Sequence, residues 1–449
     1  MKLKSFSLFL AAVMLLVFNS CKKETVDVTE LLGSVPSSAA GVVVMNLESL
    51  LDDAGCKVKD HVITPSQEVM SVLDKASSQD KQNFLMLFDG STGIEPKGAV
   101  LFYDSNRSFL TFALYDVDKF CSFVENKNGG KFVDEGSGVK INGQIAVKGA
   151  QAWICLTSGK RIDADAIASY ASLGKAQSFL VTTIGEELLI DEEDVRGWAM
   201  INTFVNECLG RSDRSMVTLS LGFLFEDAES VKFKVDFKKG ELEADAIVLN
   251  EKGKPAKYQL PAEKIDVNTL KNLGVTCDAM MAFTINSKLI KKFDQLSSAF
   301  GGAMFGNLND TFKNIDGTVG VITGSNSMEQ LKGVITTKGD VSQSLKDLIS
   351  NQIAPISIDG KLITFTKGNV SGHLDVAECA DELKGSCLGI VLDASGLNSV
   401  GYEASSMAAG FKDLVLKFKP ESGGLEMELE INTADPKENA LLTLLKSAK

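Results

Sequence analysis

Few side chains in this sequence could carry out acid-base or nucleophilic chemistry. The chain has two histidines, His61 and His373, and neither lies in a recognisable motif. A serine or cysteine nucleophile normally needs such a base beside it. The sequence also lacks a nucleophile elbow, a phosphate-binding loop, a zinc-protease motif and a calcium loop. We therefore predict two surface histidines, no catalytic residue, no cofactor and no metal site.

The acidic run Asp191-Glu192-Glu193-Asp194 concentrates oxygen ligands in one place. Consecutive residues cannot all point at one ion, so we interpret the run as a solvated loop that leads into a strand at Trp198. Carboxylate pairs for glycoside hydrolysis are brought together by the fold, and the sequence neither identifies nor excludes such a pair.

Cys21 is the one residue whose surroundings indicate a covalent modification. Lys2 and Lys4 precede an apolar run over residues 8–18, and the small Ser20 stands directly before the cysteine. The apolar run is too short for a stable membrane span, which needs about 20 residues. We predict a lipoprotein signal peptide over residues 1–20, lipidation of Cys21 and a tether over 21–34, with acyl chains holding the chain to a membrane. The alternative is an ordinary secretory signal cut elsewhere, or a short N-terminal anchor.

The remaining cysteines do not form a disulfide framework. Without Cys21 their number is odd, and no CxxC pair is present. Cys121, Cys155 and Cys387 lie in apolar runs, where a thiol behaves as a small hydrophobe, so we predict mainly buried free thiols. A bridge between Cys379 and Cys387 is the alternative.

Composition narrows the classes of function. With 449 residues, 44% of them hydrophobic, the chain can bury more than one ordinary core. A formal net charge of -13, without clustered lysine and arginine, argues against a nucleic-acid partner. Tryptophan and tyrosine are scarce, which argues against an aromatic platform for sugars.

Sequence elements of the first half recur in the same order in the second half. Two strand-helix units share an asparagine, Asn46 or Asn286, that can cap the helix, and each half closes with an amphipathic hairpin. The matched segments are 41–52 with 279–293, 98–108 with 317–327, 138–149 with 356–368, 197–202 with 388–393, and 231–245 with 414–431. The alternative for any single pair is a chance likeness, because amphipathic hairpins resemble one another.

The second closing hairpin alternates strictly between apolar and charged residues. A period of two assigns an apolar set to one face, which we predict to be core, and a charged set to the other, which we predict to be solvated. The apolar set is Leu414, Leu416, Phe418, Leu425, Met427, Leu429 and Ile431, and the charged set is Lys417, Lys419, Glu426, Glu428 and Glu430.

These patterns predict an α+β fold with two similar halves, each a mainly antiparallel sheet with helices packed on one face. The first repeat covers residues 35–250, a linker covers 251–269, and the second repeat covers 270–449. The linker is polar and contains two prolines, Pro255 and Pro261.

One segment departs from ordinary globular patterning. Residues 299–308 mix glycines with Phe300, Met304, Phe305 and Leu308, and such a stretch could be a mobile apolar lip that contacts a lipid, a peptide or a partner. The alternative is a helix connection whose large side chains fill gaps in the core.

The chain resembles a family of uncharacterised Bacteroidetes lipoproteins with a duplicated α+β mature part. The likeness rests on the signal, on the duplicated pattern and on the segment 35–50, where Val35-Pro-Ser-Ser-Ala39 leads into a buried strand and a helix. The family has no assigned active site, so the resemblance implies no catalytic residue. In such bacteria an acidic run after the lipidated cysteine is associated with the cell surface. Here Lys22 and Lys23 precede a single acid, so we expect the periplasmic face of the outer membrane.

The sequence therefore favours a membrane-anchored lipoprotein that acts as a non-catalytic binding or scaffolding module for a protein or an apolar ligand. One alternative is a hydrolase that uses carboxylates in a groove between the halves, which would require converging buried acids with shifted pKa values. Another is a carrier of lipid or lipoprotein, which would require a long apolar cavity.

Overall fold

The computed structural model describes most of the chain from Val28 onward. The described residues are 28–75, 81–82, 85–87, 89–104, 106–157, 162–208, 214, 221–222, 224–259, 261, 263–292, 308–312, 314–325, 329–394, 410–421 and 423–447. The predictions for the signal, for Cys21 and for Phe300, Met304 and Phe305 lie outside these ranges, as does the side chain of Leu308. Among the helices described, none is long and apolar enough to cross a bilayer.

The chain divides into two compact units. Unit 1 comprises Met1–Leu219, Glu229–Lys254 and Pro436–Lys449, and unit 2 comprises Ser220–Ala228 and Pro255–Asp435. This division differs from the predicted boundaries, because the C-terminal segment belongs to the first unit. The predicted linker is also partly core, since Ala256 and Ile265 are buried. The predicted tether over residues 21–34 extends too far, because Val28–Gly33 is a helix that buries Leu31 and Leu32 in the core.

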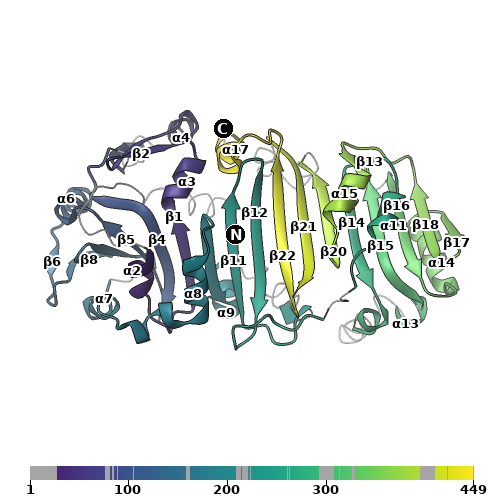
Figure 1. Cartoon of the computed structure of the whole chain (residues 1–449), viewed down its shortest axis with the longest axis horizontal. Coiled ribbons are helices and arrows are strands. Elements are labelled where there is room, and N and C mark those ends of the chain that lie inside the picture. The colour runs from purple at the N-terminus through teal and green to yellow at the C-terminus, as the bar shows by residue number, and fades with distance from the viewer. Residues whose placement is uncertain are drawn as a thin grey trace. The chain divides into compact units, whose positions relative to one another are not determined.

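Unit 1 contains an antiparallel sheet in the strand order β12-β11-β10-β1-β4-β5-β9-β8-β7-β6 (Figure 1). Its strands are β1 (Gly41–Asn46), β4 (Ile94–Asp104), β5 (Arg107–Leu114), β6 (Val133–Asp134), β7 (Lys140–Asn142), β8 (Ile145–Lys148), β9 (Gln151–Cys155), β10 (Val195–Met200), β11 (Ser230–Phe237) and β12 (Glu241–Leu249), and β2 (Lys57–Lys59) pairs with β3 (Val62–Thr64) in a separate hairpin. The helices are α2 (Val28–Gly33), α3 (Leu47–Asp53), α4 (Gln67–Leu73), α6 (Val117–Asn128), α7 (Ala164–Tyr170), α8 (Thr183–Ile190), α9 (Ile201–Cys208) and α17 (Ala440–Ser447), with short 3-10 turns at Lys175–Gln177 and Phe179–Val181.

Unit 2 contains an antiparallel sheet in the order β22-β21-β20-β14-β15-β16-β18-β17. Its strands are β14 (Ala279–Ile285), β15 (Ile315–Thr323), β16 (Leu331–Thr337), β17 (Ile356–Asp359), β18 (Leu362–Lys367), β20 (Leu388–Asp393), β21 (Phe411–Glu421) and β22 (Gly424–Thr433), and β13 (Thr276–Cys277) pairs with β19 (Leu374–Asp375). The helices are α11 (Val267–Lys271), α13 (Leu308–Thr311), α14 (Gln343–Gln352) and α15 (Val376–Glu382).

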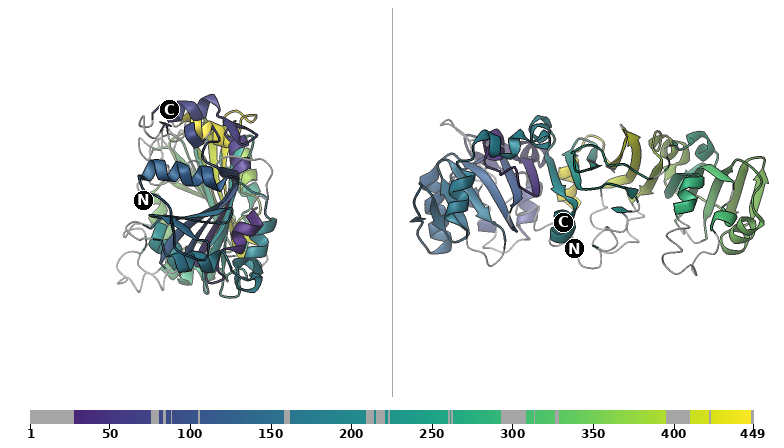
Figure 2. Two further views of the ribbon diagram at one scale, coloured as in Figure 1. Left: turned by 90° about the vertical axis from the view of Figure 1, so that its left-hand side faces the viewer. Right: turned by 90° about the horizontal axis from the view of Figure 1, so that it is seen from below.

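The α+β class with antiparallel sheets is confirmed, but the prediction of helices on one face only is wrong. In unit 1, a core beneath α3, α6 and α17 contains Phe112, and a separate core beneath α2, α7 and α8 contains Phe109. Unit 2 likewise has one core with α11 and α15 and another with α14. Figure 2 shows helices on both sides of the unit 1 strands. The central strands are apolar on both faces, as in the run Ser108-Phe-Leu-Thr-Phe-Ala-Leu114, so both faces must be covered.

Local predictions of turns and caps agree with the structure. The Asn46 side chain accepts a hydrogen bond from Ser49 N, and the Asn286 side chain accepts from Leu289 N. Gly143 and Gly360 have φ angles of 62° and 57° and form the tight turns of the predicted hairpins.

Candidate functional site

The closing hairpin of unit 2, β21 and β22, is turned the opposite way from the prediction. Lys417 was assigned to the solvated face, yet it is only 5% exposed. Of the predicted core set, Leu425 is buried at 2% exposure, but Met427 is 37% exposed, and Leu416 and Leu429 are half-buried. The alternation was correct, but the face that helices cover is the one bearing the charges.

The uncovered apolar side chains continue across the neighbouring strands. The register places Met281, Ile390, Leu416 and Leu429 in one row over β14, β20, β21 and β22. We call the whole set the apolar face, and none of its members is buried. Its three rows are Ala279, Leu392, Leu414 and Ile431; Met281, Ile390, Leu416 and Leu429; and Phe283, Leu388, Phe418 and Met427.

The apolar face extends over four strands and three rows of side chains. Strands lie about 4.8 Å apart and same-face residues about 6.8 Å apart, so the rows span roughly 14 Å in each direction between outer Cα atoms. Soluble proteins rarely expose contiguous apolar patches larger than a few hundred Å², and such larger patches often mark binding surfaces. Two methionines, Met281 and Met427, are its most exposed members at 44% and 37%, and methionine adapts well to varied apolar surfaces.

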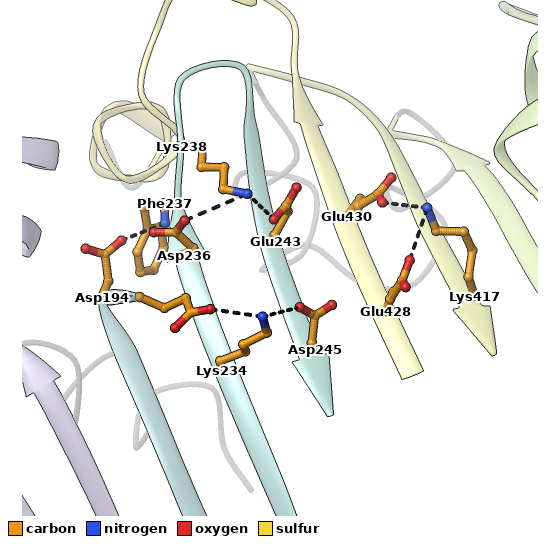
Figure 3. Close-up of polar contacts among 11 residues, drawn as sticks. Asp194, Lys234, Asp236, Phe237, Lys238, Glu243, Asp245, Lys417, Glu428 and Glu430 are labelled. Carbon is orange, nitrogen blue, oxygen red and sulfur yellow. Dashed lines mark hydrogen bonds and ion pairs between the residues drawn. The ribbon is translucent and has the colours of Figure 1, made fainter. Parts of the chain in front are cut away.

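The other face of the same strands is a closed core. Met280, Val391 and Val415 are buried there against α11 and α15. Lys417 lies in this layer, with its Nζ 2.5 Å from Glu430 Oε1 and 3.5 Å from Glu428 Oε2 (Figure 3). Burial by itself lowers the pKa of Lys417, but the Glu430 hydrogen bond and the charges of Glu430 and Glu428 outweigh it, and the pKa is raised. This lysine therefore stays charged inside the fold.

Unit 1 differs from unit 2 in what covers its closing hairpin. The apolar side of β11 and β12 packs under α17, where Phe237 and Leu242 contact the cluster that holds Leu441 and Leu445. The helix begins at Ala440, and the Asn439 side chain accepts a hydrogen bond from Leu441 N. None of the unit 2 helices that the structure describes contributes a core residue over the apolar face.

Two hollows stand out among the described residues. The two most distinct hollows both lie in unit 1. One is a polar cavity of about 70 Å³ lined by Glu193, Lys234, Asp236, Lys238, Glu243 and Asp245, and the other is a shallow depression beside α6 lined by Met86, Ser91, Asp116, Asp118, Lys119, Ser122, Phe123 and Asn126. Neither hollow has the shape that an enclosed lipid requires.

The small polar cavity is lined by a ladder of alternating charges on β11 and β12. Lys234 Nζ is 2.9 Å from Glu193 Oε1 and 3.4 Å from Asp245 Oδ2, and Lys238 pairs with Glu243 (Figure 3). These ion pairs tie the strands together, and they neutralise most of the carboxylates that line the cavity.

The acidic run before β10 is a loop, as predicted, and Glu192 in it is exposed, but its last residue is not solvated. Asp194 is fully buried, and its Oδ2 accepts a 2.7 Å hydrogen bond from Phe237 N, while its Oδ1 lacks a conventional donor. The carboxyl groups of Asp53 and Asp236 lie close enough to Asp194 for its charge to act on both. Burial, with the charge of Asp194 next, raises the pKa of Asp53 to about 8 and that of Asp236 to about 6. Asp53 and Asp236 therefore keep their protons in the folded state at a pH where free aspartic acids have lost theirs.

This carboxyl cluster predicts that unit 1 loses stability as the pH rises. The folded state keeps protons on Asp53 and Asp236 that the unfolded chain releases above about pH 4, so the loss should extend from about pH 4 to about pH 8. Asp53→Asn mimics the protonated carboxyl, and at pH 8.5 it should raise the melting temperature of unit 1 by several degrees and flatten its pH dependence. Thermal unfolding followed by tryptophan fluorescence measures this, since Trp153 and Trp198 both lie in unit 1.

The neighbouring exposed residue supplies the control. Asp52→Asn removes the same charge from the same helix end and should change the slope with pH much less, because the charge of Asp52 is the smallest influence on the pKa of Asp53. Equal slopes for Asp53→Asn and the unchanged protein would contradict a raised pKa of Asp53.

The histidines and cysteines are distributed as follows. The His61 ring is half-buried and stacks on Tyr115 with ring centres 4.0 Å apart, whereas the His373 side chain is 71% exposed. Cys155 and Cys387 are buried free thiols as predicted, and Cys121 is half-buried. The alternative bridge to Cys387 does not form, because Cys379 instead lies beside Cys277.

Comparison with known proteins gives only weak structural similarities. No protein-family model matches the sequence, and no curated protein matches it. Among solved structures, crystal form I of TP0453 is similar with a TM-score of 0.31 at 10% identity, covering 80% of this chain and 97% of that one. Crystal form III of TP0453 has the same TM-score at 8% identity and covers 78% and 96%. We base no inference on these weak similarities.

Proposed function

We propose that this protein is a membrane-tethered binding module, and that the apolar face of unit 2 is where it receives a protein partner. The main support for this proposal is the hairpin of β21 and β22, whose charged side faces the core. A fold that places Lys417 in its interior and leaves Phe418, Met427 and Leu429 partly exposed gives up stability there, and such departures are typical of binding surfaces.

The shape of the surface favours a protein over an enclosed lipid. A sheet face is broad and open, as protein interfaces are, whereas lipid carriers surround an acyl chain. An interface needs about 800 Å² on each partner, so the apolar face would form its centre and the flanking polar residues its rim.

The sequence features before Val28 supply the membrane part of the proposal. Lipidation at Cys21 would tether the units through acyl chains, and the lysines that follow it favour the periplasmic side of the outer membrane. The resemblance to uncharacterised Bacteroidetes lipoproteins is consistent with this location and stays a prediction.

We also propose that the two units arose by duplication. The order β12-β11-β10-β1-β4-β5-β9-β8 in unit 1 parallels β22-β21-β20-β14-β15-β16-β18-β17 in unit 2, strand for strand. The parallel order supports four of the five sequence matches. The fifth match, of residues 138–149 with 356–368, is shifted by one strand. The sequence match at Gly143 and Gly360 aligns β18 with β8, whereas in the sheets β18 has the position of β9.

Site-specific crosslinking in intact cells tests the binding proposal. A photoreactive residue in place of Met281 or Met427 should crosslink to one defined protein. Leu429→Asp should reduce the yield at least about tenfold, because a charge in the centre of an apolar interface must be desolvated. The measurement is crosslink yield by mass spectrometry, with the melting temperature of each variant checked in parallel.

Ile353 provides the matched control, since it is 42% exposed in unit 2 but lies outside the apolar face at the end of α14. The same photoreactive residue at that position should give no such product. Crosslinks only to lipid would favour the apolar-ligand alternative instead, and equal products at both sites would contradict a specific surface.

A further inference from the structure

Two buried carboxylates of unit 2 face each other at the edge of a strand pair. Asp278 immediately precedes β14 and Asp393 ends β20, and they are 8% and 7% exposed. Asp393 N donates a 2.8 Å hydrogen bond to the Asp278 carbonyl, which continues the register in which Ala279 pairs with Leu392. Like charges in directly opposite positions destabilise a sheet, so a positive charge between the two carboxylates would stabilise this arrangement.

His373, from the segment before β19, lies against both carboxylates. Its backbone N donates to Asp278 Oδ1 at 2.9 Å, and its Nδ1 lies 2.8 Å from Asp278 Oδ1 and 3.4 Å from Asp393 Oδ2. The preceding Gly372 allows the approach, since a Cβ there would stand 2.1 Å from the backbone carbon of Cys277. One imidazole nitrogen and two carboxylates therefore converge, with their ligand atoms within 4.8 Å of one another.

Unit 1 shows that the fold itself does not need these charges. At the same place in its strand pair, Met200 N donates a 2.9 Å hydrogen bond to the Ala40 carbonyl. The backbone arrangement is the same as that of Asp393 and Asp278, but both side chains are uncharged. The carboxylates of unit 2 are therefore an addition to the scaffold.

We propose that Asp278, His373 and Asp393 form a binding site for a divalent transition-metal ion such as Zn²⁺. At metal-ligand distances of about 2.1 Å, neighbouring ligand atoms stand about 3.0 to 3.4 Å apart, close to the 2.8 and 3.4 Å edges at His373 Nδ1. Mixed nitrogen and carboxylate ligands suit such ions, and a 2+ charge balances the two carboxylates. Three protein ligands leave positions for water or for an exogenous group.

The sequence analysis predicted no metal site, because the three ligands come from separate segments of the chain with no short spacing between them. The predicted surface position of His373 is confirmed, but the interpretation as an uninvolved surface residue missed Asp278, which only the fold brings beside it.

Titration of the metal-free mature protein with Zn²⁺ tests the proposal. After treatment with a chelator, calorimetry should give one site per chain with a dissociation constant below about 10 µM. His373→Ala should weaken Zn²⁺ binding at least about tenfold. Because the His373 side chain is exposed, its removal should leave the protein folded, so unfolding would not account for the loss. His61→Ala is the matched control, because it removes the other histidine of the chain and should bind as tightly as the unchanged protein.

A second readout keeps the result independent of calorimetry. In histidine-labelled protein, Zn²⁺ should shift the ring resonances of His373 and leave those of His61 in place, and Asp393→Asn should abolish the shift. No binding at 100 µM Zn²⁺, on the order of tenfold above the expected constant, would overturn the proposal, as would equal losses in the two histidine variants.

Discussion

Lys417→Ala should destabilise unit 2 by about 3 kcal/mol, because the substitution leaves buried negative charge without its cation. Lys417 is 5% exposed and pairs with Glu430 and Glu428. Glu382 at the end of α15 adds to the local negative charge, and burial followed by the charge of Glu430 already raises the pKa of Glu382. Calorimetric unfolding measures the effect.

Lys419 gives the matched control on the same strand. Its Nζ lies 2.5 Å from Glu428 Oε2, but its side chain is 28% exposed, so Lys419→Ala should cost less than about 1 kcal/mol. Adding Glu430→Gln to Lys417→Ala should recover part of the lost stability, because it removes one uncompensated charge. If the two lysine variants lost equal stability, burial of Lys417 would not be the cause.

Gly93→Ala should destabilise unit 1 by about 3 kcal/mol or more, through two separate effects. Gly93 has a φ of 74°, in the left-handed region that costs a residue with a side chain about 1 to 2 kcal/mol. An added Cβ would also stand 2.1 Å from the Asp116 carbonyl oxygen, and Asp116 caps α6 through Lys119 N. The backbone at the start of α6 must therefore move.

Gly129, at the other end of α6, separates the two effects. Its φ is 70°, but a Cβ there would meet nothing within 4 Å. Gly129→Ala should therefore cost only the conformational share, about 1 kcal/mol. Tryptophan fluorescence in denaturant measures both variants, and a Gly93→Ala cost no greater than that of Gly129→Ala would show that the contact with Asp116 is relieved cheaply.

Local features of this protein were predictable from sequence because their causes are local. Asn46 and Asn286 cap their helices and Gly143 and Gly360 turn their hairpins, since side-chain geometry and positive φ act within a few residues. The α+β class and the antiparallel pairing follow from the same short-range patterns.

The residue pattern alone predicts which residues share a face of a strand, since the period of two assigns Lys417 to one side of β21 and Leu416 to the other. It could not decide which side is core, because that depends on where α11 and α15 pack. Alternating side chains define two faces of a strand, but either face can become core until another layer of the fold covers one of them. The same holds for Asp278, His373 and Asp393, which are far apart in the chain and meet only when β14, β20 and the segment before β19 come together.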